Sequence, residues 1–147
     1  MAFAALFAWL LTAVGGFYLL GTWIAKGGHR GSSHLPPPVI FSHFGLAAAG
    51  LVVWIIYLIT DNNTLAWVGL LILVPVAALG FGMLARWLPT HRARGAVPAG
   101  RGAAAGDTAT HAVAERHFPV AVVGAHGLFA VVTVVLVLLS ALGVGGS

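Results

Sequence analysis

A short pattern of two histidines and a proline occurs twice in this chain and contains the residues best suited to chemistry. In each copy the histidines are nine residues apart, and the proline follows the first histidine by two. The copies are His34, Pro36 and His43, and His117, Pro119 and His126. The second histidine of each copy lies in a long apolar segment. An ionisable side chain at membrane depth is rare and is by default a candidate functional site.

The composition excludes an ordinary soluble domain. Of the 147 residues, 60% are hydrophobic and 7% are charged, which places the chain among membrane proteins. The formal net charge is +4, but the basic residues flank apolar segments, so lipid head groups rather than nucleic acid are the expected partners. There is no cysteine, which excludes thiolate metal sites, iron–sulfur ligation and covalent c-type haem attachment by this chain.

Four apolar segments each have about the 20 residues that a membrane-spanning helix needs. They are residues 2–24, 38–60, 65–87 and 118–142. We therefore expect an all-α membrane protein with four transmembrane helices in a single domain over residues 1–147. The first segment lacks the basic region of a secretory signal, so we expect it to be retained. The polar residues 61–64 predict a tight turn between antiparallel second and third helices.

All basic residues fall on one side of the predicted membrane. They are Lys26, Arg30, Arg86, Arg92, Arg94, Arg101 and Arg116. The positive-inside tendency makes this side cytoplasmic and both termini extracytoplasmic. The Ala-, Gly-, Val- and Arg-rich composition suggests a GC-rich bacterial genome, so we expect a multi-pass protein of the bacterial cytoplasmic membrane. Residues 89–116 contain few apolar side chains and predict a flexible cytoplasmic loop.

A second recurrence indicates an internal repeat. Gly16-Phe17, Leu20 and Trp23 recur as Gly80-Phe81, Leu84 and Trp87 at an offset of 64, whereas the histidine pattern recurs at an offset of 83. The difference, 83 − 64 = 19, is about the length of the predicted loop. We expect two parallel helical hairpins, repeat 1 at about 1–60 and repeat 2 at about 65–144, related by an axis along the membrane normal. Chance matching of similar apolar helices is the alternative.

His43 and His126 each follow the proline of their copy by seven residues, a helical rise of about 10 Å. They are therefore expected at equal depth, on opposite sides of one cavity, as two axial ligands of a planar macrocycle would be. Small residues share the helical face of each histidine and would leave room for such a ring. These residues are Ala47 and Gly50, and Ala130 and Thr133. Close packing of bare helices would select the same residues.

Cationic and hydrogen-bonding groups lie at the interface nearer the histidine pair and are candidates for contact with haem propionates. They are Arg30, Arg86, Arg116, His34 and His117. The alternative is that these are ordinary positive-inside residues and interfacial histidines.

Several chemistries fit the pair of histidines His43 and His126. Non-covalent haem b with bis-histidine ligation is our main hypothesis. The alternatives are a structural pair that bonds neighbouring helices, ligation of a chlorophyll-type pigment, a proton relay and a transition-metal site. Zinc is disfavoured because it takes three or four protein ligands, and the predicted helices contain no Glu, Cys or third deep His.

The arrangement resembles the small four-helix b-type cytochromes that serve as membrane subunits of respiratory and other electron-transfer complexes. The resemblance covers all four predicted helices and rests on His43 and His126. It implies one haem, electron transfer with quinone or another redox partner, and assembly with other membrane subunits; a homo-oligomer is a further candidate assembly. We expect a non-catalytic electron carrier or accessory subunit. The alternatives are a cofactor-free structural or assembly subunit of a larger membrane complex, and a pigment-binding subunit of a photosynthetic complex.

Overall fold

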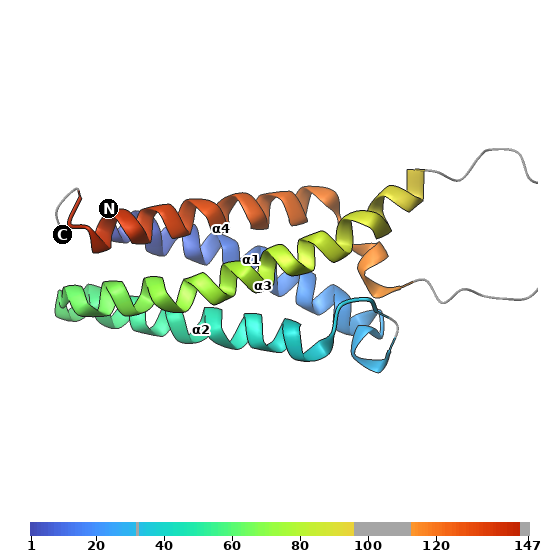
Figure 1. Cartoon of the computed structure of the whole chain (residues 1–147), viewed down its shortest axis with the longest axis horizontal. Coiled ribbons are helices and arrows are strands. Elements are labelled where there is room, and N and C mark those ends of the chain that lie inside the picture. The colour runs from blue at the N-terminus through green and yellow to red at the C-terminus, as the bar shows by residue number, and fades with distance from the viewer. Residues whose placement is uncertain (32, 96–112, 145–147) are drawn as a thin grey trace, which may run out of the picture.

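The computed structural model describes residues 1–31, 33–95 and 113–144 of the chain, and the described part is all-helical. Four long helices and two short 3-10 helices follow one another (Figure 1). They are α1 (Ala2–Ala25), η1 (Gly28–Arg30), α2 (Pro37–Thr60), α3 (Asn63–Gly95), η2 (Ala114–His117) and α4 (Val120–Ala141). Each long helix is long and apolar enough to cross a membrane. The expected four-helix, multi-pass membrane architecture is confirmed at this level.

The ends of α2 follow from its local sequence. Pro37 occupies the first turn, where the missing N–H of proline has no helical partner to lose. At the other end Asp61 adopts a left-handed conformation with φ 50°, and its N–H donates to the carbonyl of Tyr57 at 2.8 Å. The Asn62 side chain then accepts the N–H of Thr64 at 3.0 Å. This short turn makes α2 and α3 antiparallel neighbours.

Two boundaries differ from the expected ones. Helix α3 continues beyond Trp87, through Pro89, to Gly95, because a proline near a helix end removes only one hydrogen bond and the following residues are compatible with helix. Helix α4 begins at Val120 after an extended Pro119, and Phe118 stays outside it. The expected loop is thus helical at both ends, and its middle, residues 96–112, lies outside the described residues.

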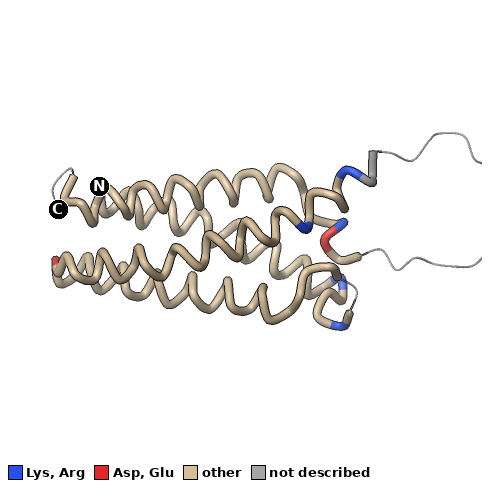
Figure 2. The backbone as a smooth tube through the Cα atoms, viewed as in Figure 1, with Lys and Arg blue, Asp and Glu red and all other residues tan. Residues whose placement is uncertain are grey.

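The helices form two close pairs, since α1 packs mainly against α4 and α2 mainly against α3. The α2–α3 turn lies at the same end of the bundle as both chain ends, whereas η1 and η2 lie at the opposite end (Figure 1). Figure 2 shows the described Lys and Arg residues gathered at the end with η1 and η2. One apolar cluster contains Trp9 and Trp54, and a second contains Trp23 and Trp87.

Candidate functional site

The structure brings the two histidines of the apolar segments together. His43 comes from α2 and His126 from α4, and both side chains are half-buried. The centres of their imidazole rings are 6.3 Å apart, and the ring planes make an angle of 61°. Because α2 and α4 do not form one of the close helix pairs, the histidines meet across the bundle.

Each imidazole is held by a main-chain carbonyl of a neighbouring helix. Nδ1 of His43 donates to the carbonyl of Val76 in α3 at 3.0 Å, and Nδ1 of His126 donates to the carbonyl of Thr12 in α1 at 2.8 Å. A carbonyl oxygen only accepts, so Nδ1 carries the hydrogen and a neutral ring keeps a lone pair on Nε2. The hydrogen bonds among the described residues involve neither Nε2 atom.

Glycines let both rings lie directly against helix backbone. A Cβ atom at Gly16 would be 3.1 Å from Cε1 of His126, and one at Gly80 would be 3.3 Å from Cε1 of His43. A Cβ atom at Gly15 would be 3.3 Å from Cβ of His126. Both distances to the rings are shorter than ordinary van der Waals contact, so a larger residue at Gly16 or Gly80 would displace an imidazole.

Two contacts of each histidine come from positions related by the same offset in the sequence. The residues whose carbonyls accept these hydrogen bonds, Thr12 and Val76, are 64 residues apart, and so are Gly16 and Gly80. Each histidine thus packs on a helix from the other half of the chain. The sequence patterns did not identify Thr12, Val76, Gly16 and Gly80 as part of the site. The recurrence of Gly16 as Gly80, at an offset of 64, was a signal for the two glycines.

The small residues beyond the histidines have protein neighbours. A Cβ atom at Gly50 would be 3.1 Å from the Trp9 ring, and buried Thr133 donates its hydroxyl to the carbonyl of Phe129 at 2.7 Å. Ala47 packs against the cluster that contains Trp9, and Ala130 is half-buried. Helix packing therefore accounts for the sizes of Gly50 and Thr133, two turns from the histidines.

The candidate propionate contacts lie at the end of the bundle with η1 and η2. The exposed Arg30 donates to Nε2 of its neighbour His29 at 3.2 Å. The exposed Arg86 donates to the carbonyl of His34 at 3.3 Å. His117 is exposed, and its Nδ1 donates to the carbonyl of Ala114 at 3.3 Å.

Arg116 is half-buried in η2. Of the candidate propionate contacts, the structure brings Arg86 and His34 together, whereas the side chain of Arg30 bonds its chain neighbour His29.

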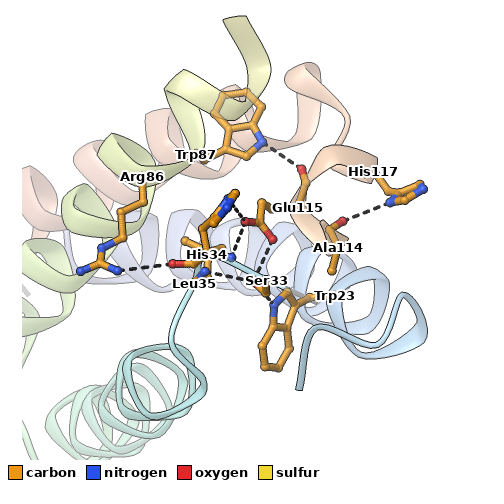
Figure 3. A network of polar contacts seen from close by, with 9 residues as sticks. All are labelled: Trp23, Ser33, His34, Leu35, Arg86, Trp87, Ala114, Glu115 and His117. Atoms are coloured by element: carbon orange, nitrogen blue, oxygen red, sulfur yellow. Dashed lines mark hydrogen bonds and ion pairs between the residues drawn. The ribbon is translucent and has the colours of Figure 1, made fainter. Parts of the chain in front are cut away.

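A buried carboxylate that the sequence interpretation missed organises this end of the bundle (Figure 3). Glu115 has no exposed surface. Its Oε2 accepts the hydroxyl of Ser33 at 2.8 Å, and its Oε1 accepts the main-chain N–H of His34 at 2.7 Å. Nδ1 of the His34 ring lies 3.2 Å from the same Oε1. Burying an unpaired carboxylate would cost several kcal/mol, so these contacts explain how it is accommodated.

Two buried tryptophans complete the Glu115 network. Nε1 of Trp23 donates to the hydroxyl of Ser33 at 2.9 Å, and Nε1 of Trp87 donates to the main-chain carbonyl of Glu115 at 3.2 Å. The Ser33 hydroxyl also accepts the N–H of Leu35 at 3.0 Å, so its single donor and both acceptor positions are used. The network therefore joins the segments before α2 and α4 to Trp23 of α1 and Trp87 of α3.

The chain matches no known protein family model, no curated protein and no solved structure.

Proposed function

We propose that this protein is a membrane cytochrome of the b type, in which His43 and His126 would both bind one haem non-covalently. It would act as an electron carrier or accessory subunit and not as a complete enzyme. The observation that carries the proposal is the pair of adjacent histidines, each with Nδ1 bonded to a helix carbonyl and with no hydrogen bond at Nε2 from the described residues.

The spacing of the rings supports ligation of one metal ion by both histidines. A bond from a metal to an imidazole nitrogen is about 2 Å, so two imidazoles could share one metal ion only if their ring centres lay within about 6 Å of each other. The observed distance is 6.3 Å. A hydrogen bond from Nδ1 to a carbonyl is also the usual way in which proteins orient a metal-binding histidine.

The set of donors favours haem over a free metal ion. No group of three or more His, Cys, Asp or Glu side chains with metal-binding geometry occurs in the described part of the chain. Zinc takes three or four protein ligands, whereas haem brings four equatorial nitrogens and needs only two axial ligands. Two imidazoles in an apolar bundle therefore suit a macrocycle that supplies the rest of its own coordination.

The residues of the chain have separate tasks in this proposal. A bound haem supplies one-electron redox chemistry, while the protein determines ligation, burial and electrostatics. The carbonyls of Thr12 and Val76 fix the orientation and protonation of the imidazoles. Gly16 and Gly80 allow the rings to lie against the helices. Ala47 and Ala130, one turn from the histidines, would leave room for a large planar group beside the imidazoles.

The remaining parts of the proposal concern topology and surroundings. The described basic residues at the end with η1 and η2 support a cytoplasmic location for that end (Figure 2), so both termini would be extracytoplasmic in a bacterial cytoplasmic membrane. The matching environments of the histidines support two parallel repeats.

A single haem near one face does not span the membrane, so we propose quinone or another redox protein as partner, within a larger complex or a homo-oligomer.

A cofactor-free structural subunit is the second candidate, and one observation favours it. Each imidazole bonds a main-chain carbonyl of a neighbouring helix, and such a bond between membrane helices contributes roughly 1 kcal/mol. In this case the two histidines would join α2 to α3 and α4 to α1, and the function would depend on the outer surfaces of the helices.

Absorption spectra of the purified protein, oxidised and dithionite-reduced, test the proposal. After expression with ample haem we expect the spectrum of one low-spin haem b per chain. His43→Ala and His126→Ala should each abolish the spectrum or convert it to that of a five-coordinate haem. His117→Ala should not, because this exposed side chain lies in η2. A colourless protein, a chlorin spectrum, or an unchanged low-spin spectrum in both ligand variants would contradict haem ligation by this pair.

A further inference from the structure

A partly enclosed cavity of about 250 Å³ lies at the end of the bundle that holds the α2–α3 turn, opposite the Glu115 network (Figure 1). Its lining comes mainly from the end of α2, the start of α3 and the end of α4. Four of the lining residues have polar side chains, namely Tyr57, Asp61, Asn63 and Ser140. The proposed haem site uses none of these residues.

Three of the four polar side chains offer oxygen acceptors to the cavity. Nδ2 of Asn63 donates to the carbonyl of Ala141 at 3.3 Å, so the amide oxygen keeps its lone pairs. The Ser140 hydroxyl donates its hydrogen to the carbonyl of Leu136 at 2.8 Å and likewise keeps two lone pairs. The Asp61 carboxylate can only accept. A ligand that fits these groups must therefore donate hydrogen bonds.

Tyr57 and Asp61 lack polar partners among the described residues. Tyr57 is 6% exposed, yet its hydroxyl makes no hydrogen bond within the described part of the chain and is not sealed from solvent. A buried tyrosine hydroxyl usually has a hydrogen-bond partner. The ion pair between His34 and Glu115 is the only one among the described residues, so the exposed Asp61 carboxylate has no cation beside it.

The distribution of charge at this end of the bundle favours a cation. The described Lys and Arg residues lie at the opposite end (Figure 2). Helix α4 ends at Ala141, next to the lining residue Ser140, and the C-terminal end of a helix carries a partial negative charge. The Asp61 carboxylate adds a full negative charge to the same cavity.

We propose that this cavity binds the ammonium group of a primary amine. An ammonium group has one positive charge and three N–H donors. Asp61 supplies the opposite charge, and the oxygens of Asn63 and Ser140 supply two further acceptors. The Tyr57 hydroxyl adds a fourth oxygen, which gives the cavity more acceptors than the ammonium group needs.

The size and ligand set of the cavity favour an organic cation over a metal ion. Ca²⁺ takes about six to eight oxygen ligands, usually with several carboxylates among them. No group of three or more His, Cys, Asp or Glu side chains with metal-binding geometry occurs in residues 1–31, 33–95 and 113–144. At about 30 Å³ per water molecule, the cavity has room for about eight waters, which suits an amine with a short carbon chain.

Two kinds of molecule supply a primary ammonium group at this position. Helices α2 and α4 are apolar enough to cross a membrane and end at Thr60 and Ala141, close to the cavity. The cavity therefore lies at the depth of lipid head groups. Phosphatidylethanolamine would reach it from the bilayer, whereas a small free amine would reach it from the aqueous phase.

Lipid binding to the delipidated full chain in detergent, measured by native mass spectrometry, tests this proposal. We expect phosphatidylethanolamine to bind about tenfold more tightly than phosphatidylcholine, because both head groups are zwitterionic but only ethanolamine donates N–H hydrogen bonds. A calorimetric titration with free ethanolamine distinguishes the two sources. Binding of free ethanolamine without preference between the lipids would identify a soluble amine as the ligand.

Two variants of the cavity and one control locate the binding. Asp61→Asn removes the charge and keeps a residue type that tolerates the left-handed conformation; we expect about fivefold weaker binding, since the carboxylate is exposed. Tyr57→Phe removes only the hydroxyl and should weaken binding about threefold to tenfold. Tyr18→Phe makes the same change at an exposed tyrosine outside the cavity and should have no effect.

The outcomes that would overturn the proposal are equally direct. One is equal binding of the two lipids together with no binding of free ethanolamine. The other is unchanged binding in the cavity variants, and Tyr57→Phe alone decides this point if Asp61→Asn does not fold.

Discussion

The glycines under the two imidazoles offer the most direct test of the site geometry. In Gly16→Ala the new Cβ would be 3.1 Å from Cε1 of His126, and in Gly80→Ala it would be 3.3 Å from Cε1 of His43. Carbon atoms prefer about 3.5–4.0 Å. The rings must therefore move by about 0.5 Å and about 0.3 Å, respectively, and their Nδ1 hydrogen bonds to helix carbonyls must change with them.

The expected loss of haem affinity follows from these displacements. Overpacking a well-filled site typically costs about 1–3 kcal/mol, which corresponds to about 5- to 150-fold in a binding constant. Gly16→Ala should fall in the upper part of this range, because its contact is shorter and the affected hydrogen bond, from His126 to Thr12, is the shorter one at 2.8 Å. Gly80→Ala should fall in the lower part.

Haem titration of the apoprotein in detergent, followed by absorbance, measures the dissociation constant and the fraction of low-spin haem. Gly21→Ala and Gly82→Ala are matched controls in the same two helices, because a Cβ atom at either position meets nothing within 4 Å. Alanine favours helix over glycine by up to about 1 kcal/mol, so the controls should fold at least as well as the unaltered protein. Equal affinity in all four variants would refute the idea that these glycines position the axial ligands.

Two further predictions concern the space around the haem and the topology. Ala47→Leu should lower haem occupancy while the protein still folds. Ala48→Leu places the same side chain about 100° around the helix and should have a milder effect. Equal haem occupancy in the two variants would argue that Ala47 serves helix packing alone. The chain has no cysteine, so single cysteines can be introduced and labelled without background. A cysteine at Asn62 should react with a membrane-impermeant thiol reagent in intact cells, and one at Lys26 should not. The reverse pattern would contradict the proposed orientation.

The four helices and the short α2–α3 turn are predictable because their signals are local. Apolar segments of about 20 residues bounded by polar or proline residues define spanning helices without any knowledge of packing. The ends are less predictable, as α3 shows by continuing through Pro89 to Gly95. A proline in the sequence indicates a boundary, but it terminates a helix only when the lost hydrogen bond and the steric clash outweigh continued helix formation.

The contacts of the site depend on pairings between distant residues, which single-sequence patterns do not contain. The histidines were recognisable from an ionisable side chain in an apolar segment. Their carbonyl acceptors Thr12 and Val76 were not, because any residue type provides a carbonyl. Glu115 was hidden for a different reason: it precedes the fourth apolar segment in a region poor in apolar residues, and only the fold shows that it is buried against Ser33 and His34.

The hydrogen bonds of the two histidines also explain why we expect haem binding to stabilise the folded bundle. His43 on α2 depends on α3 for its carbonyl partner, and His126 on α4 depends on α1. These contacts reinforce the close pairs α2–α3 and α1–α4, but they do not join one pair to the other. A ligand bridging the two imidazoles would make that connection, and a ligand present at a thousand times its dissociation constant stabilises the native state by about 4 kcal/mol. A ligand held by both imidazoles would therefore add a connection between the two helix pairs, beside the packing of α3 against α4 and of α1 against α2.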